Sequence, residues 1–480
     1  MKIVIIGSII LSIIQSVLFY GKGLGVSVVI FTISLLIYLV GTLYKLEKIE
    51  NKKALILIVP IMLLSLTYSI FSNYMFSFLN VFAILLLTAL MSYLLIKKDG
   101  LQNITGVIGK LFRVVFGPLE YIKEPINYIK TKLKWMKKSD EEDKDNAKNS
   151  ILKGVLISLP IVMIVTMLLS SADEIFANVF GDFIYFFTDN ISLHIMRCIF
   201  IFLAFIYFAS YIYNLVETDS GVNAEEGVAK KRDVNNYIIL TIITILNVIY
   251  LLFSVIQFSY LFTQIGVAKD FDYATYARSG FFELVFVSVI NLILIIISTM
   301  NRKSETRRLD IYKKVMNTLL CTFNMILLVS SWYRMYLYEA TYGYTTLRLL
   351  VYIGIVTEAI LLIITIGYIF KEKINLFKCY LVVIICMYVI INYINMDYII
   401  AKRNIDRYFM GEDIDYVYLR YLSPDASREL RRLLESEDDK MNVYIRNHLK
   451  DTYDIIEEEY SSWQEFNVSR ALTKEVAKDL

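Results

Sequence analysis

The last long apolar run of the chain ends in Asn392-Tyr-Ile-Asn-Met-Asp397-Tyr-Ile-Ile-Ala-Lys402-Arg403-Asn404-Ile-Asp406-Arg407, and a charged tail, residues 401–480, follows it. We interpret this junction as the place where the chain leaves a membrane for water. Its Asp, Asn and Arg residues are too specific in type and spacing for a generic stop signal. The junction fixes where the protein sits and leaves its biochemical activity open.

The composition around this junction is that of a polytopic membrane protein. Hydrophobic residues make up 57% of the 480 residues, charged residues make up 20%, and the mean hydropathy is +0.56. A helix needs roughly 17–25 mainly apolar residues to cross the hydrocarbon core. Eleven runs meet this requirement, near 3–20, 24–44, 54–72, 75–96, 152–171, 191–215, 237–264, 279–300, 315–339, 346–370 and 376–400. We therefore predict an all-α fold of about 11 transmembrane helices with a small helical C-terminal domain outside the membrane.

The first apolar run and the cysteines argue against a removed signal peptide and against a disulfide framework. Only Met1 and Lys2 precede the first run and no small-residue cleavage site follows it, so we expect a retained span and not a removed signal peptide. The four cysteines all fall inside apolar runs (Cys198, Cys321, Cys379 and Cys386). Cysteine in such a run behaves as a small hydrophobe, and we expect no disulfide framework, no metal cluster and no cofactor.

The charge distribution predicts an orientation. Lys and Arg number four in 45–53, twelve between Lys97 and Lys148, three in 230–232, six between Arg302 and Lys314, and three between Lys371 and Lys378. The intervening connections carry almost none. By the positive-inside rule, the N-terminus is cytoplasmic and the tail extracytoplasmic in a cell membrane. Lys402, Arg403 and Arg407 at the membrane exit argue the other way, but five basic loops agree with this orientation.

The chain divides by composition into four parts. A first block of four spans occupies 1–96, a basic cytoplasmic linker 97–150, a second block of seven spans 151–400, and the tail 401–480. No internal repeat makes the two blocks homologous halves. The tail carries thirteen Lys/Arg against eighteen Asp/Glu. Ser423-Pro424-Asp425 is typical of a helix start, and we expect the tail to be helical and to pack partly against the membrane domain.

The linker contains an amphipathic helix. Its apolar residues from Ile104 to Val115 recur at helical spacing, with Lys110 and Arg113 on other faces, and Pro118 ends the pattern before a second stripe begins at Ile122. Through 97–138 it could bind anionic membrane lipids on the cytoplasmic leaflet. The alternative is a solvated connector lying along the membrane.

Ionisable residues inside spans are costly and often functional. In the predicted topology all but one of them lie in the outer third of the bilayer. We expect an outward-facing polar cluster made of Arg197, Glu283, Arg334, Arg348, Asp397, Arg403 and Asp406. The pairs Glu283 with Arg334, or Asp397 with Arg348, could line a vestibule that receives a polar ligand or the tail. Alternatively, these groups pair with one another and simply anchor helix ends.

Glu358 is the exception, because it lies about 18 Å from Thr346 along its helix. A carboxyl group at that depth needs a cation, a proton or a hydrogen-bonding partner such as Asn324. The asparagines at 247, 291, 317 and 324 lie on spans, where they can bond across helices.

Catalytic signatures are absent from the sequence. We find no phosphate-binding loop, no H-E-x-x-H, no G-x-S-x-G and no paired CxxC, so we assign no catalytic and no metal-ligating residue. We expect no nucleic-acid partner. Three hypotheses stay open: a non-enzymatic envelope-facing protein in binding, sensing or scaffolding, with a partner on the tail; a secondary transporter using Glu358; and an envelope lipid-linked transferase.

Four stretches resemble a bacterial family of multi-span membrane proteins classified as a domain of unknown function. They are Leu168-Leu-Ser-Ser-Ala-Asp173-Glu-Ile-Phe176 in 168–176, Tyr276-Ala-Arg278-Ser-Gly280-Phe-Phe-Glu283-Leu in 276–284, Tyr338 to Arg348, and Asp397 to Ala426. The family has an acidic residue after the position of Arg278, where this chain has Ser279. The resemblance implies a bacterial inner or plasma membrane protein and no particular reaction.

Overall fold

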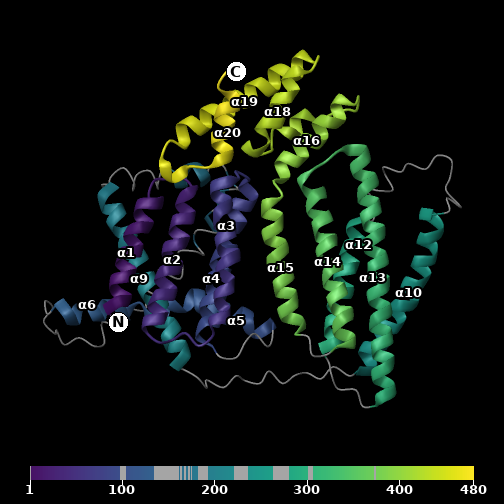
Figure 1. Ribbon diagram of the computed structural model, residues 1–480, viewed down its shortest axis with the longest axis horizontal. Helices are drawn as coiled ribbons and strands as arrows, with labels where there is room; N and C mark the ends of the chain where they lie inside the picture. Colours follow the sequence, from purple (N-terminus) through teal and green to yellow (C-terminus); the bar gives the residue numbers. More distant parts are fainter. Residues whose placement is uncertain are drawn as a thin grey trace. The chain divides into compact units, whose positions relative to one another are not determined.

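The computed structural model describes residues 2–97, 104–133, 162, 165–166, 169–170, 173, 176–181, 193–220, 236–262, 281–300, 306–371 and 375–480. Every regular element among these residues is a helix, as predicted. The chain forms two compact units (Figure 1). Unit 1 comprises Met1–Ile70, Met75–Ala224 and Ile456–Val468, and unit 2 comprises Phe71–Tyr74, Glu225–Ile455 and Ser469–Leu480.

Nine helical stretches of the described chain are long and apolar enough to cross a membrane. They are Lys2–Phe19, Val26–Lys45, Lys52–Ile70, Tyr74–Ile96, Ile195–Glu217, Asn236–Ile256, Arg307–Tyr342, Thr346–Phe370 and Leu376–Tyr393. A shorter apolar stretch, Glu283–Thr299, matches the predicted run 279–300. The predicted run 152–171 lies almost wholly outside the described residues. The protein is therefore an all-α polytopic membrane protein, which confirms the predicted fold class.

Unit 1 is built around helices α1 and α9. Its helices are α1 (Lys2–Phe19), α2 (Val26–Lys45), η1 (Lys52–Leu57), α3 (Ile58–Ile70), α4 (Tyr74–Ile96), α5 (Ile104–Phe116), η2 (Gly117–Tyr121), α6 (Lys123–Leu133) and α9 (Leu193–Ser220). Helix α1 packs on α9 and α2 through a face that carries buried Ser8, Ser12 and Ser16. Small residues let helix backbones approach closely where no water drives association. The run 191–215, which the sequence predicts in the second block of spans, contributes to α9, and α9 packs on α1.

The basic linker packs on the C-terminal half of α9. Its helix α5 coincides with the predicted stripe, and η2 begins at Gly117, next to Pro118. The Tyr207 hydroxyl donates to the Val115 carbonyl oxygen at 3.2 Å, and Asn214 Nδ2 donates to that of Arg113 at 3.2 Å. These bonds tie the linker to one end of α9.

A short tail segment packs at the C-terminal end of α1. The Gly23 amide donates to Glu465 Oε1 at 2.7 Å, the Val26 amide donates to the Phe466 carbonyl at 3.0 Å, and Gln464 Nε2 donates to the Val17 carbonyl at 3.3 Å. The segment is the single 3₁₀ turn η5 (Trp463–Glu465), closed by a capping box in which Ser462 and Glu465 satisfy each other's backbone amides. The tail segment thus supplies hydrogen-bond acceptors to backbone amides of the α1–α2 connection, and its Gln464 side chain donates to a carbonyl group near the end of α1.

Unit 2 holds the remaining spans and most of the tail. Its helices are α10 (Asn236–Phe262), α12 (Phe281–Met300), α13 (Arg307–Tyr342), α14 (Thr346–Phe370), α15 (Leu376–Tyr393), α16 (Met396–Phe409), α17 (Tyr416–Leu419), η3 (Pro424–Ala426), α18 (Ser427–Arg432), η4 (Leu433–Glu435), α19 (Asp439–Glu459), which passes into unit 1 at Ile456, and α20 (Val468–Ala477). Helix α13 packs against α10, α12 and α14 (Figure 1). Residues 430, 433, 441, 445 and 449 are buried apolar side chains of the tail.

Two predicted boundaries differ from the structure. Helix α13 extends beyond the predicted 315–339 at both ends, because the Thr306 hydroxyl accepts from the Leu309 amide and caps a polar first turn. The predicted run 376–400 is two helices and not one. Asn395 interrupts it, and its side chain accepts from the Tyr398 amide at 3.2 Å as the N-cap of α16. Asp397 therefore begins a new helix instead of ending a span.

Gly25 provides a test of the tail segment. A Cβ atom there would lie 2.4 Å from the Glu465 carbonyl carbon, a backbone atom that cannot rotate away. We expect Gly25→Ala to displace residues 462–466 and to raise amide exchange at Val26, measured by hydrogen–deuterium exchange mass spectrometry. Gly41→Ala, which meets no atom within 4 Å, is the matched control and should leave exchange unchanged. Unchanged protection at Val26 in Gly25→Ala would contradict the packing.

Candidate functional site

The polar residues of α16 hold the turn between α13 and α14. Asn404 Oδ1 accepts from the Tyr344 amide at 2.7 Å, and Asn404 Nδ2 donates to the Tyr344 carbonyl at 2.9 Å. Gly343 has a φ of 77°, and a Cβ atom on it would lie 2.5 Å from Asn404 Oδ1. Only glycine fits that conformation next to the amide. The Asn404 side chain therefore binds both backbone groups of Tyr344, as a neighbouring strand would, and holds the turn in place.

Two arginines satisfy the C-terminal carbonyl groups of α13. Arg407 Nη1 and Nη2 donate to the Glu339 and Ala340 carbonyl oxygens, each at 2.7 Å, and Arg407 Nε donates to Glu412 Oε2 at 2.6 Å. Arg348 Nη1 donates to the Tyr342 carbonyl at 3.0 Å and to that of Gly343, and its guanidinium lies 4.2 Å from the Tyr338 ring centroid. The last carbonyls of a helix lack partners within the helix and carry partial negative charge. Both arginines thus cap α13.

Two carboxylates hold the segment 71–74. Asp397 Oδ2 accepts from Asn73 Nδ2 at 2.9 Å and from the Ser423 amide at 3.1 Å, while Asp425 Oδ1 accepts from the Ser72 amide at 2.9 Å. Asp397, Asn404 and Arg407 of α16, together with Arg348 and Asp425, form what we call the collar. It joins the α13–α14 turn, the segment 71–74 and the start of the tail.

The collar shifts the pKa of two groups. Burial raises the pKa of Asp425, and the nearby Asp397 charge adds to this effect, whereas the hydrogen bond from the Ser72 amide opposes it. Burial also raises the pKa of Tyr344 to about 12, helped by a hydrogen bond to the Glu339 carboxylate and opposed by the Arg403 and Arg407 charges. Tyr344 therefore stays a neutral phenol at physiological pH.

Three other members of the predicted cluster have the following surroundings. Asp406 Oδ1 lies 2.8 Å from Arg432 Nη2, and Arg403 is exposed on α16. Arg197 belongs to unit 1, where its Nε donates to Ser16 Oγ at 3.0 Å.

The two ion pairs suggested by the sequence are not among the salt bridges of the described residues. Asp397 and Arg348 take the separate collar partners given above. Glu283 is exposed in the first turn of α12, and Arg334 is buried in α13 with an interaction of its own. Asp397 and Arg348 thus each bind backbone groups.

Glu358 lies at the middle of α14 in a hydrogen-bonded chain across four helices. Its Oε2 lies 2.7 Å from Ser288 Oγ on α12, and its Oε1 accepts from Asn324 Nδ2 on α13 at 3.3 Å. The chain continues from Asn324 Oδ1 to Asn291 Nδ2 at 3.0 Å, and from Asn291 Oδ1 to the Tyr250 hydroxyl on α10 at 2.8 Å. The asparagines at 291 and 324 thus bond across helices, as expected.

The hydrogen-bond geometry around Ser288 favours the neutral, protonated form of the Glu358 carboxyl group. Ser288 Oγ lies 2.7 Å from the Val285 carbonyl oxygen as well as 2.7 Å from Glu358 Oε2, yet a hydroxyl has only one hydrogen. A neutral Glu358 solves this, since its own O–H can donate to Ser288 while Ser288 donates to Val285. A neutral carboxyl also avoids the cost of an isolated charge in the membrane interior.

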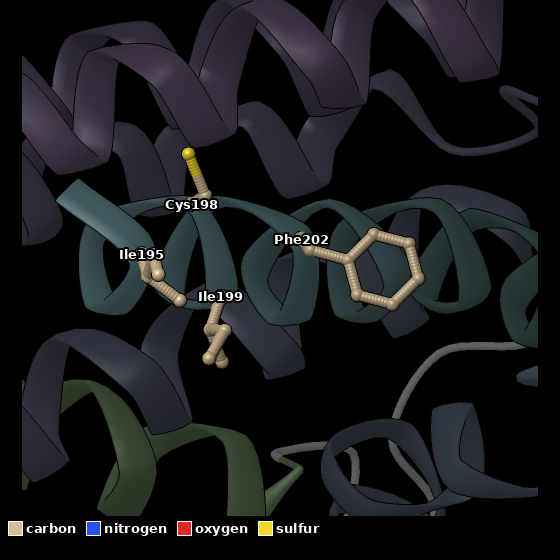
Figure 2. Close-up of a pocket in the computed structure, with 4 residues that line it drawn as sticks. All are labelled: Ile195, Cys198, Ile199 and Phe202. Carbon is tan, nitrogen blue, oxygen red and sulfur yellow. The ribbon is translucent and has the colours of Figure 1, made fainter. Parts of the chain in front are cut away.

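Helix α9 carries an apolar hollow on its surface. It has a volume of about 370 Å³ and is lined by Ile195, Cys198, Ile199 and Phe202, all on one face of that helix (Figure 2). Uncharged side chains from a single helix provide an apolar surface suited to lipid chains. Among the described residues no three His, Cys, Asp or Glu side chains gather where they could hold a metal ion.

The part of the sequence that matches a protein family contains the residues of the collar and the residues hydrogen-bonded around Glu358. A family model described as "Domain of unknown function (DUF4153)" matches residues 58–433, more than half of the chain. The chain belongs to this family. No curated protein and no solved structure matches it. Within the DUF4153 match, the stretches Tyr338 to Arg348 and Asp397 to Ala426 are the two that meet in the collar.

Some collar and chain residues were not singled out by the sequence. Asn404 and Arg407 lie in the quoted junction, where the sequence assigns them no role, and the sequence does not distinguish Ser288 or Tyr250 from other polar residues of the spans. A signal existed for Arg407, because a cation after a membrane exit can bind the carbonyl ends of neighbouring helices. Ser288 carries no such signal, since serine is common in spans.

Asn404 gives the first test of the collar. Asn404→Leu removes both bonds to Tyr344, and the buried backbone groups left behind should lower the free energy of unfolding by about 1–3 kcal/mol. Asn404→Asp keeps the acceptor and loses the donor, so its loss should be smaller. Urea unfolding in detergent measures both, with exposed Lys402→Gln as control. Equal stability of all three variants would show that the bonds between Asn404 and Tyr344 do not stabilise the turn.

Glu358 gives a second test. In Glu358→Gln the amide nitrogen replaces the carboxyl O–H toward Ser288, so we expect a loss below about 1 kcal/mol. Glu358→Ala leaves Ser288 and Asn324 without this partner and should cost about 1–3 kcal/mol. Thermal unfolding in detergent distinguishes the two, and lipid-facing Ile363→Ala serves as control on the same helix. A Gln variant as unstable as the Ala variant would show that the carboxyl group is charged.

Proposed function

We propose that this DUF4153 member is a cell-membrane protein with a cytoplasmic N-terminus and an extracytoplasmic tail, which acts without catalysis by binding an envelope component in sensing, assembly or scaffolding. One observation carries the proposal. In unit 1 helices α1 and α9 pack together, the basic linker binds the C-terminal half of α9, and the tail segment binds the C-terminal end of α1.

The ends are identified by two residues of α9. Arg197 bonds Ser16 at the end of α1 where the tail segment binds Val17, and Asn214 bonds the linker. Asn214 follows Arg197 by seventeen positions, which span about 26 Å at 1.5 Å per residue, close to the thickness of the hydrocarbon core. Since the linker region carries twelve Lys/Arg, the positive-inside rule favours a cytoplasmic linker and an external tail.

The collar supports binding over catalysis. Its charged and amide groups are engaged with backbone groups, which leaves the outer surface of the tail for contacts. The turn after α16 exposes large side chains in a short stretch: Met410 is 81% and Tyr421 82% exposed, and Phe409 and Val417 are also exposed. Exposed apolar groups on a fixed element favour a protein or envelope partner.

A secondary transporter is the second candidate, and the buried Glu358 chain favours it. A neutral carboxyl at mid-membrane could exchange a proton during transport. Helix α14, however, runs continuously from Thr346 to Phe370 through Gly354, where transporters of this kind often have broken helices. The geometry therefore supports a structural role for Glu358 better than a transport role.

A second part of the proposal concerns helix α5 of the linker, whose exposed face suits a contact with membrane lipid. Phe112 and Phe116 are exposed and stack at 5.6 Å between ring centroids, with exposed Arg113 between them in sequence. Apolar rings next to a cation fit the boundary between acyl chains and anionic head groups. We propose that α5 contacts anionic lipid there.

Cysteine labelling and photo-crosslinking test the proposed function. In a variant without the four native cysteines, Tyr421→Cys should react with an impermeant maleimide in intact cells, and Arg113→Cys only after permeabilisation. Photoreactive residues at Met410 and Tyr421 should then give the same discrete adduct, which a photoreactive residue at exposed Lys450 should not give. Labelling of Tyr421→Cys only after permeabilisation would overturn the orientation, and identical adducts at all three positions would overturn the binding surface.

A further inference from the structure

The tail segment of unit 1, residues 462–466, exposes its apolar side chains and buries polar ones. Gln464 and Glu465 are buried, as is Asn467 just after the segment, whereas Trp463 is 59% and Phe466 53% exposed. A protein surface in water favours the opposite arrangement, because burial removes apolar area from water at a gain of ~25 cal/mol per Å². The observed arrangement therefore favours an apolar medium around the two aromatic side chains.

The buried polar side chains bind backbone groups at the ends of spans. Gln464 and Glu465 bind α1 and the α1–α2 connection through the bonds given above. Asn467 Nδ2 donates to the Tyr68 carbonyl oxygen, in the last turn of α3, at 2.8 Å. Carbonyl groups in the last turn of a helix have no partner within the helix. These bonds fix which side of the segment faces the helices, so the aromatic side chains face outward.

The segment lies at the level of the membrane boundary. Helix α1 has 18 residues and α2 has 20, so they are about 27 and 30 Å long, close to the ~30 Å of the hydrocarbon core. Their connected ends therefore reach the edge of the core. The Phe466 carbonyl oxygen accepts from the amide of Val26, the first residue of α2, at 3.0 Å. The Phe466 amide in turn donates to the Trp463 carbonyl at 3.2 Å, so both aromatic residues lie at this edge.

The exposed apolar surface of the segment continues onto the spans. Val17, whose carbonyl binds Gln464, exposes its own side chain near the end of α1, and Ile13 does so one turn earlier. Leu24 in the α1–α2 connection is also exposed. Exposed apolar side chains on a membrane-spanning helix suit lipid chains. The same lipid layer reaches the segment that binds the end of this helix.

From these observations we propose that Trp463 and Phe466 insert between the acyl chains and the head groups of the adjacent leaflet and anchor this part of the tail to the membrane surface. Tryptophan suits this level, because its ring is apolar and its N–H can donate to a head-group oxygen. The contact depends only on the spans of unit 1. It does not depend on the orientation of the protein or on the surface around Met410 and Tyr421.

Tryptophan fluorescence of the full chain in phosphatidylcholine nanodiscs tests the proposal. The sequence has three tryptophans, so a variant with Trp135→Phe and Trp332→Phe reports on Trp463 alone. We expect brominated phosphatidylcholine to quench the Trp463 emission, more strongly with bromine near the head group than near the end of the acyl chain. Aqueous iodide should quench it weakly.

Two further variants complete the test. Phe466→Trp, with all three native tryptophans replaced by phenylalanine, is a second reporter and should show the same preference for shallow bromine. Glu458→Trp in the same background places the indole at an exposed position in the last turn of α19 and should respond to iodide and not to brominated lipid.

Two results would overturn the proposal. Quenching of Trp463 by iodide without quenching by brominated lipid would show that the segment faces water. Quenching by neither would show that a protein surface covers the ring in place of lipid.

Discussion

The backbone groups at the end of α13 must find partners where the chain leaves the membrane, and the architecture of unit 2 follows from this requirement. The last four carbonyl groups of a helix have no partner within it. Arg348 and Arg407 supply donors to four of the carbonyls near this end, at Glu339, Ala340, Tyr342 and Gly343, and Asn404 supplies the pair that holds Tyr344. Because Asn404 and Arg407 lie one turn apart on α16, the same contacts fix that helix. The beginning of the tail is thereby fixed as well.

The interior meets the same requirement with different groups. Around Glu358 the polar atoms come from serine, asparagine and tyrosine, whereas the end of α13 is bound by arginine. Neutral hydrogen-bonded groups are tolerated in hydrocarbon, whereas an isolated ion is not. At the water boundary, by contrast, arginine can bind several carbonyls at once through its planar fork. The depth of each site thus selects the chemistry that holds it.

The sequence predicts the spans and the fold class because hydropathy and length are local properties. It predicts that Asn324 lies near Glu358, but only as one option among a cation, a proton and an amide. It does not predict the break at Asn395, since apolar residues continue on both sides and the break depends on a cap. It also does not predict the partners of Asp397, because residue types alone cannot show that this carboxylate accepts from a backbone amide and an asparagine.

The family match separates two kinds of tail attachment. The collar lies within residues 58–433, and so does the pair between Asp406 and Arg432, which joins α16 to α18. The contacts of Glu465 and Phe466 with Gly23 and Val26 lie outside the match on both sides. In those contacts the donors are backbone amides, and the acceptors are the Glu465 carboxylate and the Phe466 carbonyl oxygen. The part of the tail up to Arg432 is therefore held by side chains inside the DUF4153 match, whereas residues 464–466 bind α1 and the α1–α2 connection through contacts outside it.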